Sequence, residues 1–193
     1  MEDYVDFEEK FKKLIEGHKN DRNYVLIEDY PKIFSTIMGI ASDRASDGMV
    51  KTIMNSAISY FILPEDVIPE TKFGVMGYID DFFICICALR ELLEYDRKLG
   101  EYLIKKHWKI EEDYEDYIPN KYYALMNKLD QKTVQDILLH SGLSYVATLV
   151  KLKTNPSKYC EQKISDLQKK LYYLMYLFFK KPIIGKDEKR EFE

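Results

Sequence analysis

Three aspartates are the residues of this chain whose types and spacing could bind a metal ion. They are Asp66, Asp80 and Asp81, within the segment LPEDVIPETKFGVMGYIDD at residues 63–81. Hard cations such as Mg²⁺ and Ca²⁺ prefer several oxygen ligands, which a loop and a following helix start can supply together. Adjacent aspartates diverge by about 100° on a helix, so only one of Asp80 and Asp81 is expected to point towards Asp66. The sequence thus predicts a candidate site for Mg²⁺ or Ca²⁺, in a cation-dependent enzyme or a ligand-binding protein.

The same residues also fit a structural role, in which the segment turns the chain between two helices. Pro64 and Pro69 each disfavour a helical conformation at the residue before them. Asp66 is placed to accept hydrogen bonds from free N–H groups of the turn. Asp80 and Asp81 fall in the first turn of the next helix, where the helix dipole favours negative charge by about 0.3–1 kcal/mol each. We favour this structural interpretation over the metal site.

No catalytic residue is predicted from the sequence. The histidines His18, His107 and His140 are far apart, and none has a second ligand at helical spacing. Cys85 and Cys87 lie in a very apolar segment, where thiols are more often inert core residues than nucleophiles. The sequence contains no nucleophile elbow, phosphate-binding glycine loop or dinucleotide-binding fingerprint. Whether the chain is an enzyme stays open, and no organic cofactor is expected.

Two apolar helices are expected, one on each side of the turn. Asp47 or Ser46 is suited to cap the N-terminus of the first helix, over about 49–63. The second helix is expected over about 78–98. Because it is apolar on nearly every side as far as Leu89, we expect it to be central rather than on the surface.

The two helices and the turn together form a recognisable motif. An apolar helix ends in Tyr, and Pro-x-Asp-x-Ile-Pro, a Gly and an Asp-Asp pair follow before a second apolar helix. The segment YFILPEDVIPETKFGVMGYIDDFFICICALREL thereby resembles the YkvA-like family of small helical domains, over about residues 53–95. The matching residues are Tyr60, Pro64, Asp66, Ile68, Pro69, Gly77, Asp80 and Asp81. Glu65, Glu70 and Gly74 depart from the usual family pattern. The resemblance implies a helical fold and the position of a distinctive loop, and it implies no reaction.

Helices are also expected through the rest of the chain, because apolar residues recur at steps of three and four and no strand-like alternation persists. The predicted elements are a helix over 4–15, one starting at 29–31, one over about 101–108, one opened by Pro119, one over 134–139 capped by Asp130 and followed by Gly142 in a left-handed conformation, one begun by Ser144, and a long one opened by Pro156.

The predicted fold class is all-α, a compact multi-helix domain built around a central apolar helical hairpin. We expect one domain over 1–180, with the hairpin core at about 47–100 and a C-terminal helical part over 101–180. The remaining residues, 181–193, are expected to form a charged flexible tail.

Composition excludes several classes of partner. The chain has 193 residues and a formal net charge of −4, so it lacks the basic field that binding to a phosphate backbone requires, and no nucleic-acid partner is expected. Its uncharged apolar runs are shorter than the roughly 18–20 residues needed to span a bilayer. Three cysteines, an odd number, and a start without a signal peptide predict a cytoplasmic protein.

The final predicted helix is the best candidate for an interface. Its segment LYYLMYLFF, at 171–179, is apolar on more than one side and lies between Lys169–Lys170 and Lys180–Lys181. It can be buried in the domain's own core, bind a protein partner or a second copy, or contact a membrane surface. We therefore expect a non-enzymatic module that acts by protein interaction, self-association or peripheral membrane contact.

Overall fold

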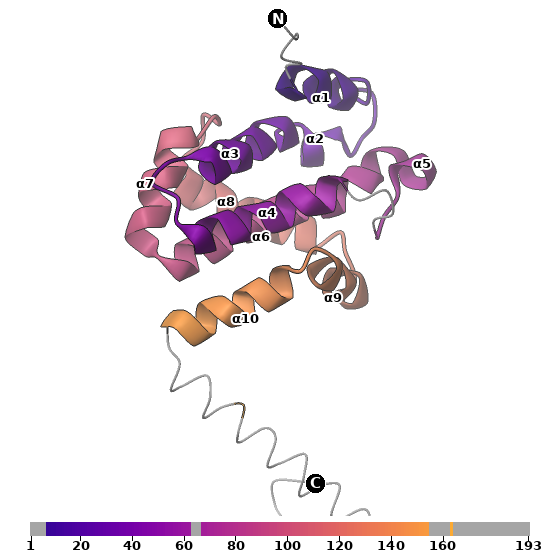
Figure 1. Ribbon diagram of the computed structural model, residues 1–193. Helices are drawn as coiled ribbons and strands as arrows, with labels where there is room; N and C mark the ends of the chain where they lie inside the picture. The colour runs from indigo at the N-terminus through magenta and orange to yellow at the C-terminus, as the bar shows by residue number, and fades with distance from the viewer. Residues whose placement is uncertain (1–6, 63–66, 155–162, 164–193) are drawn as a thin grey trace, which may run out of the picture. The chain divides into compact units, whose positions relative to one another are not determined.

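Residues 7–62, 67–154 and 163 are described in the computed structural model. The elements, in chain order, are α1 (Phe7–Glu16), α2 (Tyr24–Ile27), α3 (Tyr30–Ser42), α4 (Gly48–Ile62), α5 (Glu70–Phe73), the 3₁₀ helix η1 (Gly74–Tyr78), α6 (Ile79–Tyr95), α7 (Arg97–His107), α8 (Tyr114–Met126), α9 (Gln131–His140) and α10 (Leu143–Thr154) (Figure 1). No strand occurs among these residues, which confirms the predicted all-α fold class.

Contacts between Cα atoms divide the chain into two compact units, Met1–Val150 and Lys151–Glu193. Most of the second unit lies outside the described residues, and so do the predicted helix opened by Pro156 and the predicted tail at 181–193. The single domain proposed for 1–180 and its tail therefore stay predictions.

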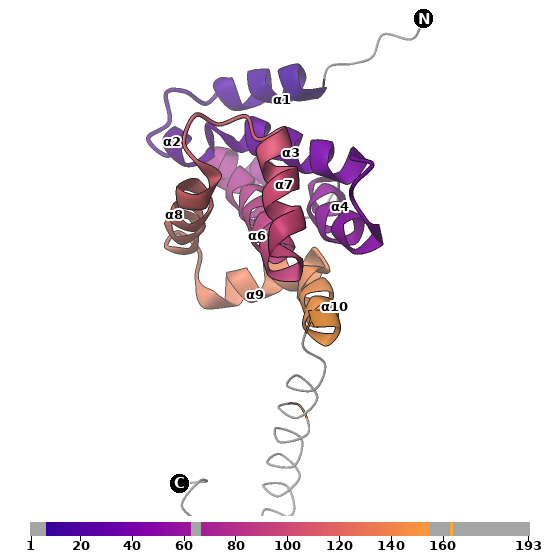
Figure 2. The same cartoon turned by 90° about the vertical axis from the view of Figure 1, so that its left-hand side faces the viewer.

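The centre of the first unit is the pair α4 and α6, which pack against each other more extensively than any other two elements. From Ile79 to Leu89 every residue of α6 is buried. A helix that is apolar all round must be covered on every side. The helices α3, α4, α7 and α8 all contact α6 and provide that cover (Figure 2). The predicted central apolar hairpin is confirmed.

Aromatic rings join the N-terminal helices to this hairpin. Phe11 of α1 meets Tyr30 of α3 edge to face, with ring centroids 4.7 Å apart. Phe34 of α3 and Phe61 of α4 lie at the same centroid distance of 4.7 Å. Tyr30 also stacks on Phe82 of α6, at 5.2 Å. Such pairs add roughly 0.5–1.5 kcal/mol beyond the burial of their area, so these ring contacts help to hold α1 and α3 to the hairpin.

Aspartate side chains set the start of most of the later helices. Asp47 accepts hydrogen bonds from the amides of Met49 and Val50, both at 2.9 Å, which confirms it as the cap of α4. Asp130 caps α9 by accepting from Thr133 N at 2.9 Å, as predicted. Such caps contribute about 1 kcal/mol each.

Two predicted helix boundaries are wrong. The helix expected over 78–98 is interrupted at Asp96, which is extended (φ −148°, ψ 102°) and accepts a hydrogen bond from Leu99 N as the cap of α7. Pro119 does not open its helix but lies inside α8, which starts earlier because Asp113 caps it. In both cases a capping aspartate decides where the helix begins. The spacing of apolar residues does not change at that point, so it does not indicate the boundary.

Short elements and left-handed glycines connect the longer helices. The segment between α4 and α6 contains the short elements α5 and η1 where the sequence indicated only a loop, and Gly74, the first residue of η1, is left-handed at φ +56°. Gly142 is left-handed at φ +73°, as predicted for the end of α9. Helix α10 begins at Leu143, one residue before the predicted Ser144.

Candidate functional site

Two of the three predicted ligands are buried at one end of the hairpin. Asp80 is fully buried and Asp81 is 3 % exposed, both in the first turn of α6. Asp66 lies outside the described residues. Among the described residues, no group of three or more His, Cys, Asp or Glu side chains could hold a metal ion. That the side chain of Asp66 converges with those of Asp80 and Asp81 therefore stays a prediction.

The carboxylate of Asp80 joins the turn to both helices of the hairpin. Its Oδ2 accepts a hydrogen bond from the hydroxyl of Tyr60, at 2.8 Å, and another from the amide of Ile68, at 3.0 Å. The Tyr60 hydroxyl in turn accepts from the amide of Val67, at 3.1 Å. Tyr60 is in the last turn of α4, so these bonds connect α4, residues 67–68 and α6. We call Asp80, Tyr60 and the amides of Val67 and Ile68 the Asp80 network.

Burial determines the protonation of the phenol in this network. It raises the pKa of Tyr60 far above its ordinary value, and the nearby Asp80 charge raises it further. The hydroxyl therefore stays protonated and keeps donating to Asp80. Because hydrogen bonds to a charged acceptor contribute about 1.5–3 kcal/mol, this bond offsets part of the cost of placing a carboxylate in an apolar interior.

The structural interpretation assigned the binding of turn amides to Asp66, whereas here Asp80 accepts one of them, from Ile68. These contacts also show how the predicted residues are positioned: Tyr60 by the last turn of α4 and Asp80 by the first turn of α6. Asp81 occupies the next position of that turn, and its charge helps to raise the pKa of Cys85, one turn later in α6.

The two cysteines of α6 are poor nucleophiles. Burial raises the pKa of Cys85 well above its ordinary value, and the charge of Asp81 adds to this. Burial likewise raises the pKa of Cys87 to about 12. Since the thiolate is the reactive form, both side chains behave as small core residues, in agreement with the sequence.

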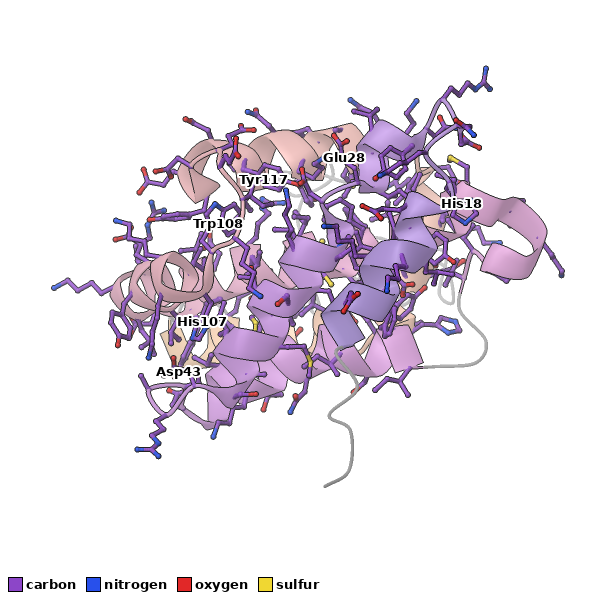
Figure 3. All side chains as sticks on the ribbon, turned by 90° about the horizontal axis from the view of Figure 1, so that it is seen from above. His18, Glu28, Asp43, His107, Trp108 and Tyr117 are labelled. Carbon is purple, nitrogen blue, oxygen red and sulfur yellow. The ribbon has the colours of Figure 1, made fainter. Side chains whose placement is uncertain are left out.

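A second polar cluster was not predicted from the sequence. Asp43, at the C-terminal end of α3, accepts from Lys106 Nζ and contacts His107 Nε2, each at 2.7 Å from its Oδ2. Figure 3 shows His107 directed towards Asp43. The Asp43 side chain is only 4 % exposed, and its Oδ1 accepts from Ala45 N at 2.9 Å. We call Asp43, Lys106 and His107 the Asp43 cluster.

Close packing holds the His107 ring in place. A Cβ built on Gly39 would lie 2.6 Å from His107 Nδ1, so only a residue without a side chain allows this contact. The hydroxyl of Thr36 donates to the carbonyl of His107, at 3.1 Å. The cluster ties the end of α3 to the end of α7. Because 64 residues separate Asp43 from His107, no local sequence pattern could have indicated it.

Comparison with known proteins gives one match. A family model described as a protein of unknown function, DUF1232, matches residues 50–87, which include most of α4, the turn and the first half of α6. No curated protein and no solved structure matches the chain. The chain is thus similar to this uncharacterised family over the hairpin that carries the Asp80 network.

The Asp80 network predicts a large effect of replacing Tyr60 by phenylalanine. This change removes the donor to Asp80 and the acceptor for the Val67 amide, without changing the shape of the ring. We expect a loss of about 1–3 kcal/mol in the free energy of unfolding, measured by urea denaturation, because a buried carboxylate loses a partner.

Tyr95→Phe is the matched control, because the Tyr95 hydroxyl donates to Asp47 at 2.7 Å in an exposed position. We expect that variant to lose clearly less stability. Equal losses in the two variants would show that the Asp80 network contributes no more to the free energy of unfolding than the exposed hydrogen bond between Tyr95 and Asp47.

The Asp43 cluster predicts a dependence of stability on pH. The hydrogen bond from Lys106, then that from Ala45 N and the contact with His107, hold the pKa of Asp43 well below its ordinary value. Its stabilising contribution is therefore complete above the ordinary carboxyl pKa of about 3.9 and is lost as the pH falls towards the lower folded value.

Asp43→Asn should accordingly lower the urea midpoint at neutral pH, and the difference from the native chain should shrink below about pH 4. Paired urea titrations across the acidic range measure this. A difference that stays constant down to low pH contradicts the assignment.

Proposed function

We propose that the chain is a non-enzymatic helical module that binds the anionic surface of a membrane through α9 and α10. The observation that carries this proposal is the outer face of α10, where Tyr145 is 66 % and Leu149 48 % exposed. Leu139 of α9 is exposed as well. We call Leu139, Tyr145 and Leu149 the α9–α10 face.

The buried side of α10 shows that this exposure follows a pattern. Leu143, Val146 and Val150 are buried, at steps of three and four, and hold the helix to the rest of the unit. Tyr145 and Leu149 are themselves four residues apart, so they lie on one face of the helix. Helix α10 is thus apolar on its outer side as well as its inner side, unlike an ordinary surface helix.

The charges of this helix favour an anionic partner. The sequence of α10, LSYVATLVKLKT, contains no acidic residue, and its only charges are Lys151 and Lys153. The chain as a whole carries a net charge of −4. A helix with exposed Leu and Tyr and only cationic charges is suited to the boundary between lipid headgroups and acyl chains.

The mode of binding would be peripheral. Over the described part of the chain, no helix has both the length and the apolar character to cross a bilayer. Juxtaposed lysines contribute about 1 kcal/mol each near an anionic leaflet. In the sequence beyond α10, Lys169, Lys170, Lys180 and Lys181 flank an apolar run, a composition that also suits an anionic surface.

Co-sedimentation with vesicles tests this proposal. The full chain is expected to sediment with vesicles that contain phosphatidylserine and to stay in solution with vesicles of phosphatidylcholine alone. Replacing Leu139, Tyr145 and Leu149 together by serine should reduce the bound fraction several-fold, because the apolar contact is lost while the lysines remain.

The matched control replaces Leu14, Val25 and Tyr123 by serine, since these residues have comparable exposure on other helices. That variant should bind like the native chain. If the native chain binds neither kind of vesicle, the membrane proposal fails. If the native chain then forms a dimer and the triple serine variant of the α9–α10 face does not, the face serves self-association. If the native chain forms no dimer, a protein partner is the remaining interpretation.

A divalent cation site at the turn is the second candidate function. The observation that favours it is the position of the Asp80 network: Val67, the residue after Asp66 in the sequence, is hydrogen-bonded to the same phenol that binds Asp80. Asp81 is buried in the same turn of α6. Carboxylates of these three residues would supply oxygen ligands for Mg²⁺ or Ca²⁺.

Thermal unfolding with and without Mg²⁺ or Ca²⁺ tests the cation site. Under this candidate the cation raises the Tm of the native chain and leaves that of Asp66→Asn unchanged. Asp116→Asn, on the exposed surface of α8, is the control and should respond like the native chain. If Asp66→Asn retains native stability and no cation shifts the native Tm, the turn is purely structural.

A further inference from the structure

A cavity of about 180 Å³ lies where the last turns of α6 meet the first turns of α7 and α8. All of its lining residues belong to the first unit, and none is part of the Asp80 network or the α9–α10 face. Pockets that take drug-sized ligands have volumes of roughly 300–1,000 Å³. This cavity therefore suits a smaller molecule.

One part of the lining is apolar. Tyr114 and Ile118 of α8 are buried, and Leu93 of α6 is half-buried. Pro119 of α8 also lines the cavity, and because it has no N–H group it cannot donate to the carbonyl of Glu115, one turn earlier. The same wall thus offers apolar surface and a backbone acceptor that lacks its usual helical donor.

The other part of the lining is charged, with two cations and two anions. These residues are Arg90, Glu94, Arg97 and Glu115, and all four are exposed. Their formal charges cancel. A cavity with balanced charges is complementary to a ligand that carries both charges, rather than to a simple anion or cation.

The two arginines have the same choice of partner and differ in their contacts. Arg97 Nε donates to Glu101 Oε1, four residues later in α7, at 2.5 Å. Arg90 has Glu94 at the same spacing in α6, where opposite charges commonly pair. Over the described residues, however, neither Arg90 nor Glu94 takes part in an ion pair. The cavity is thus lined by a guanidinium and a carboxylate that do not neutralise each other.

An aromatic ring holds the guanidinium of Arg90. Its Cζ lies 3.7 Å from the centroid of the Tyr122 ring, and that ring stacks on the buried Phe83 with centroids 5.6 Å apart. Stacking occupies a face of the guanidinium and leaves the N–H donors in its plane for a carboxylate. Arg90 is therefore oriented before a ligand arrives, which lowers the entropy cost of binding.

We propose that this cavity binds a free α-amino acid with an apolar side chain. The carboxylate of the ligand pairs with the guanidinium of Arg90. Its ammonium group pairs with Glu94 and has the carbonyl of Glu115 as a second acceptor. Its side chain lies against Leu93 and Ile118, where burial of apolar surface adds to the affinity. This site is independent of the membrane contact proposed for the α9–α10 face.

Titration of the full chain with L-leucine, followed in amide NMR spectra, tests the site. The native chain should show saturable shifts at the lining residues. Arg90→Gln and Glu94→Gln should each raise the dissociation constant about tenfold or more, because each removes a charged hydrogen-bonding partner. Arg44→Gln is the matched control, since Arg44 is exposed and does not line the cavity. Its dissociation constant should equal that of the native chain.

Two analogues of leucine examine the need for both charges on the native chain. Isocaproate lacks the amino group and isoamylamine lacks the carboxylate, so each should bind about tenfold more weakly than leucine, or weaker still. The absence of saturable shifts with leucine, or native affinity in both glutamine variants, overturns the proposal. If isocaproate binds as tightly as leucine, the cavity is an anion site and the assignment to an amino acid is overturned.

Discussion

The carboxylate of Asp80 is the constraint on which the hairpin depends. A negative charge inside an apolar interior costs several kcal/mol unless hydrogen-bond donors surround it. Here the donors come from α4, through Tyr60, and from the turn, through the amide of Ile68. The turn must therefore return to the helix pair at one point, and α4 and α6 must meet in one register.

Hydrogen bonds from a tyrosine hydroxyl to an aspartate recur at other helix ends. They account for part of the tyrosine content of this chain. Tyrosine hydroxyls bind aspartates on distant helices in three pairs within the described residues: Tyr60 with Asp80, Tyr95 with Asp47, and Tyr117 with Asp29. Two of these aspartates stand at the N-cap positions of α3 and α4. A tyrosine contributes a ring to the core and a hydroxyl to a charged acceptor, so one residue type supplies both packing and orientation.

The Asp80 network and the α9–α10 face differ in how they relate to the core. The Asp80 network lies inside it, where Asp80 Oδ2 and the Tyr60 hydroxyl accept hydrogen bonds from amides of the turn. The α9–α10 face lies outside it, whereas Leu143, Val146 and Val150 of α10 are buried. An exposed apolar face departs from the pattern of an ordinary surface helix, and such departures are where function is most often found.

The sequence by itself determined the helical class, the central hairpin and the cap at Asp130, and it limited the cap of α4 to Asp47 or Ser46, because periodicity and capping are local properties of the chain. It also located the turn and its aspartates. Only the tertiary structure decided that Asp80 binds Tyr60, that Asp43 meets His107 across 64 residues, and that Arg90 lies over Tyr122. Those contacts depend on how helices cross, which the spacing of residues within one helix does not encode.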